Sequence, residues 1–140
     1  MKLYYDMLIP FMPDSKVDEN GNVVPDIQKI EGRKAMSELA EFQSSGNVLC
    51  LYNSVYHACL YADVDLYDKL LNLPEDIEIP AVSIADAVRI CVDMLFRTSN
   101  PNSDEKFDID RFICLLLTSA HFALETLSNR DKKTENPEHS

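Results

Sequence analysis

The sequence predicts a mainly α-helical protein, a single-domain bundle of four to five helices with a small N-terminal β-hairpin or extended arm. Three observations carry this prediction. The 140 residues suit one compact domain. Hydrophobic residues make up 46% of the chain, enough for a substantial core, and after residue 26 they recur at helical spacing. Glycine occurs only three times, which disfavours sandwiches and barrels with many tight turns.

The first 25 residues are predicted to be extended. Residues 2–12 (KLYYDMLIPFM) are rich in aromatic and apolar side chains, which is typical of a strand or an extended arm, and Pro10 would confine such a strand to an edge. Residues 15–25 are expected to form a hairpin, because Asn20-Gly21 readily accepts the positive φ values of a tight turn. Residues 2–12 are a candidate partner strand for this hairpin.

Two long helices are expected next, over residues 26–44 and 48–62. Asp26 is a suitable cap for the first, and Ser45-Gly46-Asn47 should end it and begin the second. The second (VLCLYNSVYHACLYA) is apolar around most of its circumference, so we expect it to be largely buried.

The remaining elements follow from caps and loop composition. A short helix is expected at 64–72, followed by a stiff acidic connector from Pro74 to Pro80. Ser83 begins the next helix, with Asp86 three positions later in a partial capping box, and residues 97–107 form a loop. The last helix, roughly 109–128, is our choice for the central core element. The globular domain is thus 1–128, with the bundle at 26–128 and a flexible polar tail at 129–140.

Charge narrows the class of partner. The formal net charge is −11 at pH 7, whereas binding to nucleic acid or to an anionic membrane requires an excess of Lys and Arg on some face. We therefore expect no direct contact with either. A basic protein, or the basic nucleic-acid-binding groove of a protein, would be attracted to this surface.

The cellular location is predicted to be cytoplasmic and reducing. Asp6 and Pro10 interrupt what would have to be the apolar part of a signal peptide, and no apolar run approaches the ~18 residues that span a bilayer. The four cysteines lie within apolar helical patterns and are expected to be reduced; two disulfides are the alternative that an even count leaves open.

No phosphate-binding glycine loop, nucleophile elbow or Cys/His zinc set is present, so no catalytic residue, metal or cofactor is predicted.

One enzymatic alternative uses carboxylates. Glu38 and Glu41 form one spaced acidic pair, and Asp65 and Asp68 form another. In spacing alone, this is similar to the all-helical nucleotide pyrophosphohydrolases, which gather magnesium with two such pairs. The competing interpretation is a solvated surface, with Asp65 favoured by the helix dipole.

The candidate binding site is an acidic stretch in residues 60–80. Its carboxylates are Asp63, Asp65, Asp68, Glu75, Asp76 and Glu78. Tyr61 and Tyr67 are candidates for aromatic contacts with a partner, since tyrosine is favoured where apolar contact meets water. A second acidic group, at residues 104–110, would extend this patch if the fold brought the two together. The alternative interpretation is a solvated acidic surface.

The leading hypothesis is an acidic, non-enzymatic binding protein that inhibits a basic protein partner. Its size and charge are similar to those of bacterial toxin-immunity proteins and of phage proteins that disarm host defences; the likeness is one of composition. A structural or assembly subunit is the third hypothesis, with apolar helix faces completed by another chain or by a second copy in a homo-oligomer.

Overall fold

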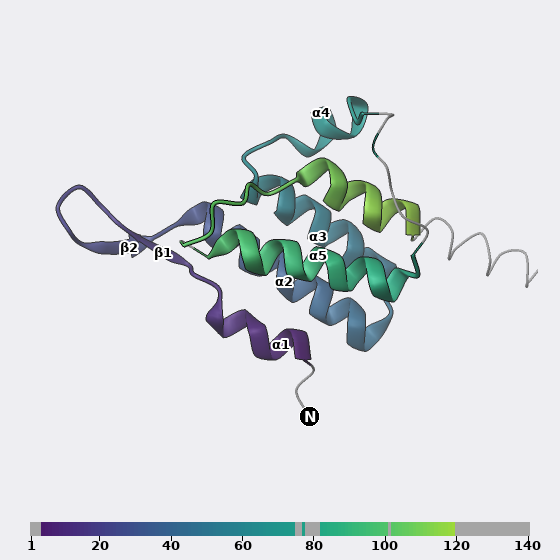
Figure 1. The fold of residues 1–140 in the computed structure, drawn as a ribbon, viewed down its shortest axis with the longest axis horizontal. Coiled ribbons are helices and arrows are strands. Elements are labelled where there is room, and N and C mark those ends of the chain that lie inside the picture. The colour runs from purple at the N-terminus through teal and green to yellow at the C-terminus, as the bar shows by residue number, and fades with distance from the viewer. Residues whose placement is uncertain (1–3, 75–76, 78–81, 101, 120–140) are drawn as a thin grey trace, which may run out of the picture.

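The computed structural model describes residues 4–74, 77, 82–100 and 102–119, which form a helical bundle with one projecting hairpin (Figure 1). This confirms the predicted mainly α class with a small N-terminal hairpin. In chain order the elements are α1 (Tyr4–Leu8), a 3₁₀ turn (Ile9–Phe11), β1 (Ser15–Val17), β2 (Val23–Pro25), α2 (Ile27–Ser45), α3 (Val48–Tyr61), α4 (Leu66–Leu71), α5 (Ile84–Ser99) and a helix over 109–119.

The predicted strand or arm at residues 2–12 is wrong for the part that is described. Residues 4–11 are helical, and β1 pairs with β2 rather than with this segment. The reason is that the apolar residues of this segment have helical spacing. Tyr5 and Met12, seven apart, are buried in the core, and Leu8 and Ile9, which lie between them in the sequence, are partly buried against it. Pro10 lies in the first turn of the 3₁₀ helix, where its missing N–H costs nothing.

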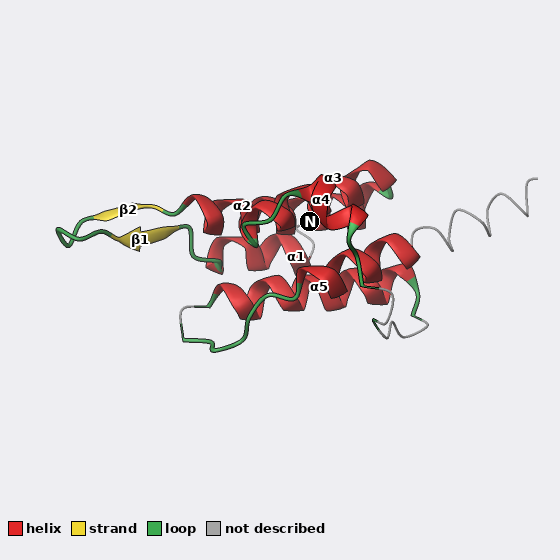
Figure 2. Cartoon of the chain, turned by 90° about the horizontal axis from the view of Figure 1, so that it is seen from above, coloured by secondary structure: helices red, strands yellow, loops and turns green. Residues whose placement is uncertain are grey.

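The hairpin at residues 15–25 is confirmed, with Ser15 opposite Pro25 and Val17 opposite Val23. Its loop is longer than the predicted two-residue turn. Gly21 alone takes a positive φ, of 81°, while the Asp18 carboxylate accepts hydrogen bonds from the backbone N–H groups of Asn20 and Asn22, both at 2.9 Å. The hairpin projects away from the helices in both views (Figures 1 and 2).

The predicted helix caps are present. Asp26 accepts from the N–H of Lys29 at 3.2 Å, and Gly46 ends α2 with a φ of 70°. Asn47 and Ser83 cap α3 and α5 in the same way as Asp26. Helix α5 continues to Ser99, beyond the predicted start of a loop at residue 97, because its last polar side chains find partners within the helix. The Arg97 guanidinium lies 2.9 Å from Asp93, one turn back.

The helices form two layers, α2 with α3 and α5 with the 109–119 helix (Figure 2). The 109–119 helix supplies several of the most buried side chains, as expected of the central core element. Fully buried are Met36, Leu39, Leu51, Leu95, Phe112, Ile113, Leu115 and Leu116. The acidic connector at 75–76 and 78–80, the predicted end of the last helix and the polar tail lie outside the described residues.

All four cysteines are free, as predicted, and Cys50, Cys59 and Cys91 are buried. Burial raises the pKa of the Cys59 thiol to about 11 and raises that of Cys91 further. Among the described residues, no helix combines the length and apolar character needed to cross a membrane.

Helix α3 differs from its prediction, because it is buried on one side only. Its inner face carries Leu51, Val55, Ala58 and Cys59, all 3% exposed or less. Its outer face carries large apolar side chains that remain in solvent: Leu49, Tyr52, Tyr56 and Leu60. A single sequence shows that a helix is apolar all round, but not how many neighbours the bundle provides to cover it.

Gly32 of α2 lies against the ring of Tyr61 of α3. A Cβ atom at this position would lie 3.0 Å from Cδ1 of Tyr61. The Tyr61 ring packs against Phe107, with ring centroids 5.1 Å apart, and its hydroxyl lies 3.1 Å from the Thr98 hydroxyl. The ring therefore has little freedom to retreat, and Gly32 is retained in a helix interior despite its low helix propensity.

Gly32→Ala is expected to destabilise the wild-type protein by about 1 kcal/mol, because overpacking against Tyr61 outweighs the gain in helix propensity. In a Tyr61→Leu background, where the ring is gone, the same substitution should stabilise by up to about 1 kcal/mol. Urea unfolding of the four proteins in this double-mutant cycle measures both values. An effect of the same sign in the two backgrounds would contradict the described contact.

Candidate partner-binding surface

The segment from Asp63 to Leu71 joins the end of α3 to α4, and each of its acidic residues has a local structural role. Asp63 has a φ of 59°, in the left-handed region that Asp and Asn tolerate better than most residues. Asp65 caps α4 by accepting from the N–H of Asp68 at 2.8 Å. Asp68 accepts from the side-chain amide of Asn72 at 3.1 Å. All three carboxylates are exposed.

An ion pair fixes how α4 sits on the bundle. Lys69 Nζ lies 2.9 Å from Oδ1 of Asp110, at the start of the 109–119 helix, and Leu66 packs against the core. The opposite side of α4 is left in solvent, with Tyr67 73% exposed and Leu71 70% exposed. We define the α4 surface as the exposed residues of this segment: Asp63, Asp65, Tyr67, Asp68, Leu70 and Leu71.

The electrostatics of the described residues favour a negative field over the α4 surface. Most basic side chains are held by carboxylates, each within 4.0 Å: Lys29, Arg33, Lys34, Lys69, Arg89 and Arg97. By contrast, no basic residue in the described part of the chain pairs with Asp63, Asp65 or Asp68. Their charge therefore remains available to a partner.

The structure separates the two predicted aromatic contacts. Tyr67 is exposed, whereas Tyr61 is partly buried and packs against Gly32 of α2, Thr98 and Phe107. Glu75, Asp76 and Glu78 lie outside the described residues. The sequence reasoning missed Leu70 and Leu71, because which leucines of a six-residue helix face inward depends on where α4 docks.

The second acidic group meets the α4 surface at one point. Asp110 lies beside α4, where it forms the ion pair with Lys69, so this member of the group adjoins the α4 surface as predicted. Two other members of the group have their own partners. Glu105 accepts two hydrogen bonds from Arg97, at 2.7 and 2.9 Å, and Asp108 caps the 109–119 helix through the N–H of Arg111. The extension is therefore short and partly neutralised.

The four carboxylates of the hydrolase hypothesis are not brought together. Burial raises the pKa of Cys50, near the start of α3, and the charges of Glu38 and Glu41 raise it further. The charge of Asp65 instead contributes to the raised pKa of Cys59. Cys50 and Cys59 are nine residues apart, or about 13 Å along a helix. The described residues contain no group of three or more Asp, Glu, His or Cys side chains placed to hold a metal ion.

His57 is the histidine that the structure describes, and it ties α3 to α2. Its Nδ1 lies 2.6 Å from Oε2 of Glu31, and its ring meets that of Tyr56 edge-on at 5.2 Å. Burial acts to raise the pKa of Glu31, but hydrogen bonds from His57 and Lys34 lower it overall. The His57–Glu31 contact therefore links α3 to α2.

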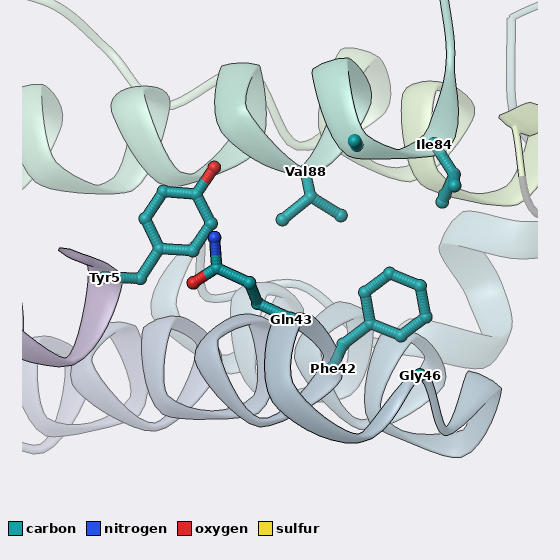
Figure 3. Close-up of a pocket in the computed structure, with 7 residues that line it drawn as sticks. Tyr5, Phe42, Gln43, Gly46, Ile84 and Val88 are labelled. Atoms are coloured by element: carbon teal, nitrogen blue, oxygen red, sulfur yellow. The ribbon is translucent and has the colours of Figure 1, made fainter. Parts of the chain in front are cut away.

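A pocket of about 280 Å³ opens between α1, the end of α2 and the start of α5 (Figure 3). Tyr5 and Gln43 lie close together at one end, while Phe42 and Ile84 lie toward the other with Val88 between the ends. The lining residues include no carboxylate, imidazole, thiol or cation, and they offer mainly apolar contact. Sequence reasoning could not find this pocket, because one wall is α1, a segment that the sequence predicts to be extended.

Comparison with known proteins assigns no family. The chain matches no protein-family model, no curated protein and no solved structure at a significant level.

Proposed function

We propose that this protein is an acidic, non-enzymatic binding protein that inhibits a basic protein partner by covering its working surface. The observation that carries the proposal is the composition of the α4 surface. Two largely exposed apolar side chains, Tyr67 and Leu71, lie among three carboxylates without a described basic partner. Exposed aromatic and aliphatic anchors within a charged rim are typical of binding hot spots.

The two kinds of residue would act at different stages. The net charge of −11 attracts a basic partner over distance and speeds encounter, most strongly at low salt. Tyr67 and Leu71 would then be buried in the partner and slow dissociation. A basic groove that normally holds nucleic acid is the surface best matched to this charge, so inhibition would be by competition with nucleic acid.

We place this action in the cytoplasm, as for immunity-type or anti-defence inhibitors. The free thiols support this choice, since three of the four are buried in the core as small apolar groups.

Neutralising the α4 surface is expected to weaken partner binding about tenfold at low salt without unfolding the protein. The test is the triple variant Asp63→Asn, Asp65→Asn and Asp68→Asn. Asparagine tolerates the positive φ at 63, caps a helix as well as aspartate does, and can accept the Asn72 hydrogen bond. We expect the immobilised wild-type chain to retain a basic protein from host extract that elutes as salt rises, and the triple variant to retain less of it and to release it at lower salt.

The matched control removes three charges elsewhere, through Glu19→Gln, Glu41→Gln and Asp104→Asn, all at exposed positions. It should retain the same protein as the wild type. Equal retention by the triple variant and this control would contradict the role of the α4 surface. A captured protein that still binds its nucleic acid in the complex would contradict inhibition by competition.

A further inference from the structure

The outer face of α3 presents an apolar stripe that nothing in the described bundle covers. The stripe consists of four residues, whose exposed fractions are 65% for Leu49, 49% for Tyr52, 49% for Tyr56 and 38% for Leu60. Their spacing of three, four and four residues places them on one side of the helix, as in a helix that packs against another helix. We call these four residues the α3 stripe. In Figure 2, α3 lies at the outer side of its layer, away from α5.

This stripe lies on a helix without charge. The 14 residues of α3 include no Asp, Glu, Lys or Arg, although the chain as a whole carries a net charge of −11. Asn53, which is exposed and lies among the stripe residues, is polar but neutral. A basic partner would therefore find nothing on α3 to attract it, in contrast to the α4 surface.

We infer that the α3 stripe binds the α3 stripe of a second copy of this chain, with the two helices antiparallel about a two-fold axis near Asn53 and Tyr56. Such a contact is self-complementary: Leu49 of one copy meets Leu60 of the other. Two chains of like charge repel each other across most of their surfaces, and α3 offers an uncharged face on which they can meet.

Charge at the ends of α3 selects the antiparallel arrangement. Asp63, Asp65 and Asp68 follow the C-terminal end of the helix, and parallel pairing would bring the two sets of carboxylates together. Antiparallel pairing instead places each set near the N-terminal end of the partner helix. That end carries the positive pole of the helix dipole, and it lies near two carboxylates of α2, Glu38 and Glu41, rather than three.

The area that the two copies bury determines how tightly the dimer associates. The exposed parts of the four stripe side chains amount to about 450 Å² per copy, so the dimer buries on the order of 1,000 Å² in total. This is near the lower limit for a specific interface, so we expect a reversible dimer that forms at micromolar to submillimolar concentration.

Sedimentation velocity across a concentration series tests the inference. The wild-type protein should shift from a monomer of 15.9 kDa toward twice that mass between about 10 µM and about 500 µM. Raising the salt from about 0.05 M to about 0.5 M should strengthen association, because it screens the repulsion between like-charged copies. A monomer at every concentration and salt would overturn the inference.

A matched pair of variants locates the contact. Asn53→Lys places two like charges beside the two-fold axis and should weaken association about tenfold or more. Asn102→Lys makes the same change at an exposed position away from α3 and should leave association as strong as in the wild type, or slightly stronger. A dimer that both variants leave equally strong would form through another surface and would overturn the inference.

The orientation has its own test. A mixture of Leu49→Cys and Leu60→Cys proteins should cross-link under mild oxidation, whereas neither protein alone should, since the native cysteines near this face are buried. Cross-linking of either variant with itself would overturn the antiparallel arrangement. The inference stands apart from the proposed function: salt strengthens self-association but weakens the binding of a basic partner, so either can fail without the other.

Discussion

Leu51→Ala is expected to lower the free energy of unfolding by about 2–5 kcal/mol, whereas Leu49→Ala, two residues earlier on α3, should change it by less than about 0.5 kcal/mol. The two substitutions remove the same atoms and change helix propensity equally. They differ in surroundings, because Leu51 is 1% exposed in the core and Leu49 is 65% exposed on the outer face. Urea unfolding followed by far-UV circular dichroism measures both values.

This comparison should be made at a few micromolar protein, where association through the α3 stripe contributes little. The variants then report the orientation of α3 alone. Similar losses for Leu49→Ala and Leu51→Ala would mean that both sides of α3 are buried, and the basis for an exposed stripe would be removed.

Phe112→Ala is expected to cost about 3–5 kcal/mol, at the upper end of what a single substitution removes from a protein core. Phe112 is fully buried in the central helix, and its ring meets that of Phe107 with centroids 5.4 Å apart. Phe107 in turn contacts Tyr61, so the truncation leaves a cavity beside the packed rings of Phe107 and Tyr61. Thermal or urea unfolding gives the change in stability.

Phe11→Ala is the matched control for this substitution. Phe11 is 74% exposed, so its truncation should change stability by less than about 0.5 kcal/mol. If Phe112→Ala prevents folding, Phe112→Leu provides a milder test, with an expected loss of about 1–1.5 kcal/mol. A loss no larger than that of Phe11→Ala would contradict the central position of the 109–119 helix.

The sequence predicts the elements of this fold better than it predicts their faces. Helix starts are local: Asp26 and Ser83 cap α2 and α5 because a side-chain oxygen needs only the next turn of its own helix. The hairpin is local as well. The prediction of a strand or extended arm over residues 2–12 is wrong for its described part because it rests on aromatic composition, although Tyr5 and Met12 have helical spacing.

Features that depend on distant contacts could not be predicted. The exposed face of α3 exists because the described bundle has two layers, and the burial of Tyr61 depends on Gly32, 29 residues earlier. On the α4 surface, the carboxylates and Tyr67 could be named from the sequence. That Leu71 is exposed beside them depends on how α4 docks, which the Lys69–Asp110 ion pair fixes across 41 residues of chain.

Association kinetics between this protein and its captured basic partner test the central claim most directly. For the wild type, the association rate constant should fall steeply as salt rises. For the variant with Asn at 63, 65 and 68 it should be about tenfold lower at low salt and should fall less steeply with salt. Tyr67→Ala with Leu71→Ala should leave association fast and speed dissociation instead. Equal rate constants and equal salt dependence for the wild type and the triple Asn variant would contradict the claim that the α4 surface recruits a basic partner.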